Sequence, residues 1–258
     1  MSVRINTNID ALNAQRNLSM TSVAFSKSVE KLSSGLRINR AADDAAGLAI
    51  SQGLDSQVNG LNQAQRNAQD GISLVQTGEG ALNEVSSMLQ RIRELAVQYN
   101  NGTNDANAQA SIQAEADALQ TTIASIGTNT KFNGVALLTA GTITLQVGAN
   151  ADETQTVTTT KLDTSAADVA DLSTIDAVIA DVSTQRAAFG AAQNALEHTV
   201  NSLTVASENF TASESRIRDL DVASEMVKFT KTQILQQAGT AILAQANSAP
   251  QNILTLLK

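Results

Sequence analysis

The 258-residue sequence has no cysteine, a single proline (Pro250) and a single histidine (His198). Without cysteine there is no disulfide and no thiolate metal site, and one histidine is too few for a histidine-based zinc site or a HExxH motif. Asp43 and Asp44 are adjacent, about 100° apart on a helix, so they cannot act as paired catalytic carboxylates. We expect them to start a helix beside Arg40, which is near enough for a salt bridge. The sequence therefore predicts no enzyme, cofactor or metal.

The charge balance argues against nucleic acid as a partner. The chain has 17 basic and 25 acidic residues, a formal net charge of −8, whereas nucleic-acid affinity rests mainly on neutralising phosphates. No apolar run approaches the roughly 20 residues that span a bilayer, so we expect no membrane insertion. Residues 1–17 lack the apolar core of a cleavable signal peptide.

Aromatic residues are scarce, at 2% of the sequence, which favours thin packing of aliphatic helices over a thick globule. Three segments repeat apolar residues at steps of three and four, as in a coiled coil or helical bundle. Their apolar positions are Leu82, Val85, Leu89, Ile92, Ala96 and Tyr99; Ile112, Ala116, Leu119, Ile123 and Ile126; and Leu172, Ile175, Ile179, Val182, Phe189, Leu196, Val200, Leu203, Phe210 and Ile217. A continuous helix over 172–217 would be roughly 70 Å long. We predict a mainly α, elongated helical rod or coiled-coil bundle.

Two breaks interrupt these patterns. Residues 99–109 contain the Asn and Gly of a turn between antiparallel helices. Residues 128–165 are rich in Thr and Val, with a turn signal at Asn133-Gly134 and alternation over 142–147 and 154–158, which predicts one or two β-hairpins. The two glycines within 77–82 allow either a kink or a helix end.

Both ends of the chain carry apolar stripes, although termini are normally frayed and polar. Each stripe needs a partner, which is the other terminus, neighbouring chains, or both. The positions expected to face a partner are Ile5, Ile9, Leu12, Leu32 and Leu36 near one end, and Leu220, Val227, Ile234, Ala241, Leu254 and Leu257 near the other.

Four separated motifs resemble bacterial flagellin, the subunit of the flagellar filament. They are "LSSGLRINRAADDAAGLAIS", "LQRIRELAVQ", "FNGVALL" followed by "TLQVGAN", and "TQILQQAGTAILAQANSAPQNILTLL". The resemblance implies an inner domain of paired terminal helices that fold during assembly, a helical rod domain, and a short hairpin region in place of large outer domains. The corresponding residues are 1–42 with 216–258, 43–130 with 172–215, and 131–171.

The same resemblance implies a structural subunit that self-polymerises into the filament for swimming motility. Flagellins leave the cell unfolded through the flagellar export apparatus without cleavage, which places them outside the cell. A chaperone binds the C-terminal segment, here roughly 215–258, and the filament cap and hook–filament junction proteins are further partners. The resemblance to "LQRxREL" also implies a patch recognised by a host Toll-like receptor, formed by Gln90, Arg91, Ile92, Leu95 and Glu115. In a filament this face lies between subunits, so its first role is packing.

Three other functions compete with this one. A hook–filament junction protein shares flagellin-like ends but would form a short ring. A flagellin with a peptidase in its variable region would need more than one histidine. A cytosolic coiled-coil adaptor would explain the heptads but not the motifs at both ends.

Overall fold

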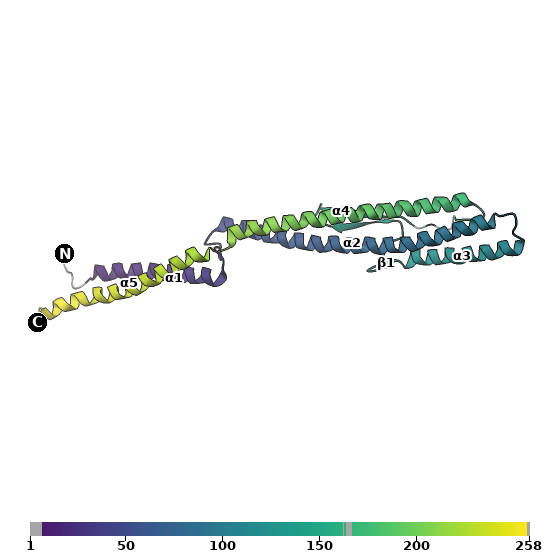
Figure 1. Ribbon diagram of the computed structural model, residues 1–258. Helices are drawn as coiled ribbons and strands as arrows, with labels where there is room; N and C mark the ends of the chain where they lie inside the picture. Colours follow the sequence, from purple (N-terminus) through teal and green to yellow (C-terminus); the bar gives the residue numbers. More distant parts are fainter. Residues whose placement is uncertain (1–6, 162, 164–166, 257–258) are drawn as a thin grey trace. The chain divides into compact units, whose positions relative to one another are not determined.

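The computed structural model describes the backbone of residues 7–161, 163 and 167–256, and side chains as far as residue 248. Within these residues the chain forms five helices and four short strands (Figure 1). They belong to two compact units: Met1–Asp55 with Thr211–Lys258, and Ser56–Phe210. We call these the terminal unit and the central unit.

The terminal unit contains helices α1 (Ile9–Ser34) and α5 (Val222–Leu256), which lie side by side (Figure 1). The side chain of Asn8 caps the start of α1 by accepting from the N–H of Ala11 at 3.1 Å. At the other end Gly35 has a φ of 72° and donates to the carbonyl of Lys31 at 2.9 Å, a left-handed cap that suits glycine. Local residues therefore fix both ends of α1.

The segment after α1 leads into α2 (Ala45–Tyr99). Asp44 caps this helix, since its carboxylate accepts from the N–H of Gly47 at 2.9 Å, as predicted. The Asp43 carboxylate accepts from the N–H groups of Asn39 and Arg40. The predicted salt bridge from Arg40 to these aspartates is wrong. The Arg40 guanidinium pairs with Glu30 at 2.8 Å, because both aspartates are already bonded to backbone N–H groups.

The central unit packs residues 56–99 of α2 against α3 (Ala106–Asn129) and α4 (Leu172–Arg218). The expected turn after Tyr99 is present, and Asp105 caps α3. The glycines within 77–82 do not end α2, which continues to Tyr99. At Gly78 an added Cβ would lie 2.6 Å from the ring of Phe189, so the glycine lets α4 approach closely.

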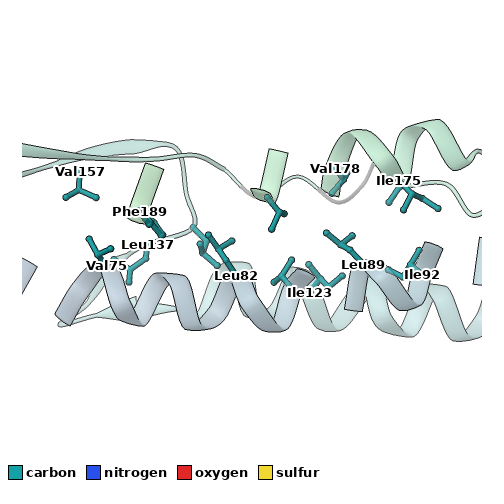
Figure 2. Packing of buried hydrophobic residues seen from close by; sticks show 14 of the residues in the cluster. Val75, Leu82, Leu89, Ile92, Ile123, Leu137, Val157, Ile175, Val178 and Phe189 are labelled. Atoms are coloured by element: carbon teal, nitrogen blue, oxygen red, sulfur yellow. The ribbon is translucent and has the colours of Figure 1, made fainter. Parts of the chain in front are cut away.

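The three predicted apolar stripes meet in one core as far as Val200. Leu203 and Phe210, further along the third stripe, belong to a second, smaller cluster with Leu61 and Ala64. Figure 2 shows side chains of α2 and α4, among them Leu82, Leu89, Ile175 and Phe189, pointing toward one another, and each is essentially fully buried. Ile123 of α3 belongs to the same core. The mainly α fold predicted from the spacing is confirmed.

Two antiparallel hairpins complete the central unit. Strands β1 (Lys131–Phe132) and β2 (Val135–Ala136) are joined by Asn133 and Gly134, whose φ angles of 49° and 85° are those of the tight turn that Asn-Gly favours. Strands β3 (Gly141–Gln146) and β4 (Thr154–Thr159) pair with Ile143 opposite Val157. Val157 faces the core and the flanking threonines face outward, so the predicted hairpins are confirmed.

Candidate assembly and recognition surfaces

The contact face between α1 and α5, which we call the seam, runs at heptad spacing along both helices. Its positions are half-buried or buried, and many are small or polar. On α1 they are Ala11, Ala14, Leu18, Thr21, Phe25, Ser28 and Leu32, and on α5 they are Glu225, Phe229, Thr232, Gln236, Gly239, Leu243 and Ala246. The seam therefore buries little apolar area for helices of this length.

Specific contacts show that the two helices are antiparallel. The amide of Asn8 donates to the carbonyl of Ala246 at 2.7 Å, near one end of the pair. In the middle the rings of Phe25 and Phe229 stack with centroids 5.1 Å apart. Gly239 lies against Leu18, so close that an added Cβ would be 3.1 Å from Leu18 Cδ1.

A second apolar face of each helix is left exposed. Val227 is 70% exposed, Ile242 is 60% exposed and Ile234 is 59% exposed. On α5 this face forms a shallow groove of about 540 Å³. Its lining residues are Met226, Val227, Thr230, Lys231, Ile234 and Leu235. On α1 the more than half-exposed side chains are Ile9, Leu12, Met20 and Val23. We call these surfaces the outer faces.

The residues predicted to face a partner lie in three places: the seam, the outer faces, and the short segments that follow α1 and precede α5. Ile9, Leu12, Val227, Ile234 and Ala241 are exposed, whereas Leu32, Leu36 and Leu220 are half-buried within the terminal unit. Ile5 and Leu257 lie outside the described residues, as does the side chain of Leu254. The sequence left the partner of each stripe open. In the structure one face of each helix pairs within the chain, and the other face meets nothing among the described residues of its unit.

The second candidate surface lies on the central unit around Arg91. The Arg91 guanidinium bonds the carboxylate of Glu115 at 2.8 Å and that of Glu94 at 3.1 Å. These bonds, the one to Glu115 first, raise the pKa of Arg91. Gln90 is exposed beside it.

Two residues of the predicted receptor patch do not reach this surface. Ile92 and Leu95 are 0% and 1% exposed and belong to the core of the central unit. Both belong to the buried side of α2, with Leu89 and Ala96, so a ligand on the Arg91 side cannot touch them. The surface available for recognition comprises Gln90, Arg91, Glu94 and Glu115.

Sequence reasoning missed several residues of these surfaces. Met226, Leu235 and Ile242 of the outer face were overlooked, although an apolar stripe two to three residues wide was a usable signal. Ser28 and Glu225, which are both buried in the seam, were overlooked because they are polar.

Nothing in the described part of the chain suggests catalysis. His198 is exposed on α4. Within the described ranges no three His, Asp or Glu side chains gather closely enough to hold a metal ion. Over the same residues, every helix is too short or too polar to cross a membrane.

Comparisons with known proteins agree on one family. The family described as the bacterial flagellin N-terminal helical region matches residues 5–144, and the bacterial flagellin C-terminal helical region matches residues 172–257. A flagellin of Halalkalibacterium halodurans is 51% identical over 270 residues, which cover 98% of this chain and 99% of that protein. The flagellar filament 33 kDa core protein of Treponema phagedenis is 45% identical over 284 residues, with 98% and 99% covered. The crystal structure of Bacillus cereus flagellin is similar with a TM-score of 0.50 and 33% identity, over 54% of this chain and 88% of that one.

Proposed function

Because the chain belongs to the bacterial flagellin family, as a short form, we propose that its copies join through the outer faces of α1 and α5. The family makes it a structural subunit of the flagellar filament, a homopolymer, and not an enzyme.

The observation that carries the proposal is the exposed apolar area of the terminal unit. Val222, Val227, Ile234 and Ile242 on α5, and four large apolar side chains on α1, are all more than half exposed. Full burial of such a side chain contributes roughly 1.5–3 kcal/mol, so each has about 1 kcal/mol still to gain. Neighbouring copies that cover both outer faces would contribute several kcal/mol per subunit. Patches of this kind mark interaction sites.

The weak seam makes ordering depend on neighbours. Fixing a backbone costs about 1–2 kcal/mol per residue, and α1 and α5 contain 26 and 35 residues. Ser28 is the single buried residue of α1, a helix that the structure describes throughout. Contacts within the chain therefore offset little of this cost, which supports folding of the inner domain, residues 1–42 and 216–258, during assembly.

The exposed apolar face of α5 also supports the proposal that other proteins bind the chain before it assembles. A chaperone on residues 215–258 would cover the outer face of α5, and the export apparatus would carry the chain unfolded to the filament cap outside the cell. Since the chain lacks cysteine, no disulfide would obstruct this passage.

Seeded polymerisation tests the proposal. Purified subunit would be mixed with short filament fragments, pelleted and imaged by negative-stain electron microscopy. We expect long filaments from the full chain, none from a chain lacking residues 216–258, and a large loss with Ile234→Asp. The matched control, Ile234→Leu, keeps the apolar surface and should polymerise. Equal polymerisation of the Asp and Leu variants would show that the outer face of α5 is not part of the assembly surface. Short rings in place of filaments would favour a hook–filament junction protein.

Recognition by a host Toll-like receptor is the second candidate function, and the exposed pair of Arg91 and Glu115 favours it. Arg93 provides a matched control, because it lies on the same helix, is equally half-exposed and pairs with Asp176 at 2.7 Å. In a receptor reporter assay Arg91→Ala should lose the response while Arg93→Ala keeps it. Equal responses from both variants would rule out this surface.

A further inference from the structure

A buried carboxylate lies in the seam between α1 and α5. Glu225 and Ser28 are each 5% exposed. The Ser28 hydroxyl donates to Glu225 Oε1 at 2.7 Å, and the Lys228 ammonium contacts Oε2 at 3.1 Å. A buried carboxylate is tolerated where its oxygens are bonded and is strongly unfavourable where they are not. Both oxygens of Glu225 have a partner in this alignment of the helices.

The apolar contacts of the seam do not define that alignment. If α5 moved along α1 by seven residues, Phe229 would leave Phe25 and meet either Leu18 or Leu32, which are equally apolar. The remaining seam positions are mostly Ala, Thr, Gln and Gly, which tolerate many neighbours. Within the two helices, heptad spacing therefore permits at least three alignments, as it does in coiled coils that lack a polar specifier. Beyond the helix ends, the backbone bonds from Leu220 to Gly35 at 3.0 Å and from Arg37 to Arg218 at 2.7 Å also favour the observed alignment.

Glu225 distinguishes these alignments. A shift in one direction takes it beyond the last turn of α1, to the level of Gly35. A shift in the other direction brings it to Thr21, whose hydroxyl already donates to the carbonyl of Asn17 at 2.8 Å. In both cases the bond from Ser28 is lost: Ser28 faces Thr232 in the first shift and lies beyond the start of α5 in the second.

We propose that Glu225 and Ser28 form the specificity-determining pair within the seam, which selects the register of α1 against α5 together with the backbone bonds beyond the helix ends. The correct register is the one that aligns the outer faces, so the pair acts on assembly indirectly. The inference concerns one unit of one chain and stands independently of how copies join.

The absence of native cysteine allows a direct test by disulfide cross-linking. The Cβ of Leu18 lies 3.8 Å from the ideal Cβ position of Gly239, within the range for a disulfide. The double variant Leu18→Cys, Gly239→Cys therefore reports the observed register. Leu18→Cys with Thr232→Cys, and Leu18→Cys with Ala246→Cys, report shifts of seven residues in either direction.

Each cysteine pair would be placed in the full chain and combined with Glu225→Leu, Glu225→Gln, or the control Asp10→Leu, which removes an exposed carboxylate of α1. Seeded pellets and supernatants are both oxidised and run on non-reducing gels, where an intrachain disulfide changes the mobility of the monomer. In the supernatant the helices pair only transiently, and oxidation traps the registers that they sample, so a variant that does not polymerise is still read there. A failure of assembly alone therefore does not hide the register.

With Glu225 intact, we expect the 18–239 disulfide to dominate. Glu225→Leu should raise the shifted disulfides at least about tenfold, whereas Glu225→Gln, which can still bond Ser28, and Asp10→Leu should not. An unchanged pattern in Glu225→Leu would overturn the proposal. Loss of every cross-link in that variant would also overturn it, because the pair would then hold the helices together without selecting their register.

Discussion

Gly78 on α2 contacts Phe189 on α4, so the effect of Gly78→Ala on stability should change sign depending on whether the Phe189 ring is present. Glycine in a helix is less stable than alanine by about 1 kcal/mol, so Gly78→Ala would ordinarily stabilise the central unit. In this structure the added methyl would lie 2.6 Å from Cε2 of the buried Phe189 ring. Overpacking of this kind costs about 1–3 kcal/mol. We therefore expect Gly78→Ala to destabilise the protein by about 1 kcal/mol.

Removing the Phe189 ring should reverse the effect of Gly78→Ala on stability. Phe189 is fully buried, and Phe189→Ala should cost about 3–5 kcal/mol. For a unit of about 150 residues this lowers the melting temperature by about 6–20 °C. In that background the methyl at position 78 enters the space that the ring has left, so Gly78→Ala should stabilise by about 1 kcal/mol. The coupling energy between the two sites is then about 2 kcal/mol.

Gly80 supplies the matched control, because it lies two residues further along the same helix and an added Cβ there meets nothing within 4 Å. Gly80→Ala should stabilise by about 1 kcal/mol with or without the ring. Differential scanning calorimetry of the parent chain, the three single variants and the two double variants with Phe189→Ala measures all of these terms. The reasoning is refuted if Gly78→Ala stabilises the chain that retains Phe189, or if Gly78 and Gly80 behave alike.

Two further predictions concern the terminal unit. The hydrogen bond from Ser28, and after it the bond from Lys228, lowers the pKa of the Glu225 carboxylate below its ordinary value of 4.5. The stability that the ionised carboxylate contributes is therefore present above pH 4.5 and is lost as the pH falls through the lowered pKa. The yield of the 18–239 disulfide, formed with a pH-insensitive oxidant, should therefore fall as the pH is lowered beyond 4.5, and less so in Glu225→Gln; a flat profile would contradict this. Asp44→Ala removes the N-cap of α2 and should cost about 1 kcal/mol in urea unfolding, whereas Asp44→Ser should cost little; equal losses would argue against capping.

The helical core could be predicted because burial follows a single spacing rule. Leu82, Leu89 and Ile92 repeat at steps of three and four, and no competing apolar face exists on that part of α2, so the stripe indicated the core correctly. The Asn133-Gly134 turn could be predicted equally well, because few other dipeptides adopt positive φ at both positions.

The pairing of α1 and α5 could not be predicted in the same way, because the face of α5 that pairs is less apolar than the face that is exposed. Val227 and Ile234 recur seven residues apart on the exposed face, whereas Phe229 on the paired face is followed seven residues later by the polar Gln236. The pairing uses the less apolar face, where Gly239 allows Leu18 to approach. Apolar spacing alone favoured the face that is in fact exposed.

Two residues of the predicted receptor patch, Ile92 and Leu95, were placed on the surface wrongly for a different reason. The motif was taken as a linear string, whereas successive residues of a helix point in different directions. Ile92 belongs to the same apolar stripe as Leu89 and Ala96, so the spacing already placed it in the core. Arg91 and Glu115 come from different helices, and only their packed arrangement shows that they form an ion pair.

Labelling of a single introduced cysteine tests most directly whether copies join through the outer faces. Val227→Cys changes the most exposed of the large apolar side chains on α5 conservatively, in a chain that has no other thiol. Its reaction with a maleimide would be timed in the soluble subunit and in seeded filaments. We predict rapid labelling of the subunit and labelling at least about tenfold slower in the filament, as expected for a buried thiol. Equal rates in both states would contradict the account, because the outer face of α5 would then remain open to solvent after assembly.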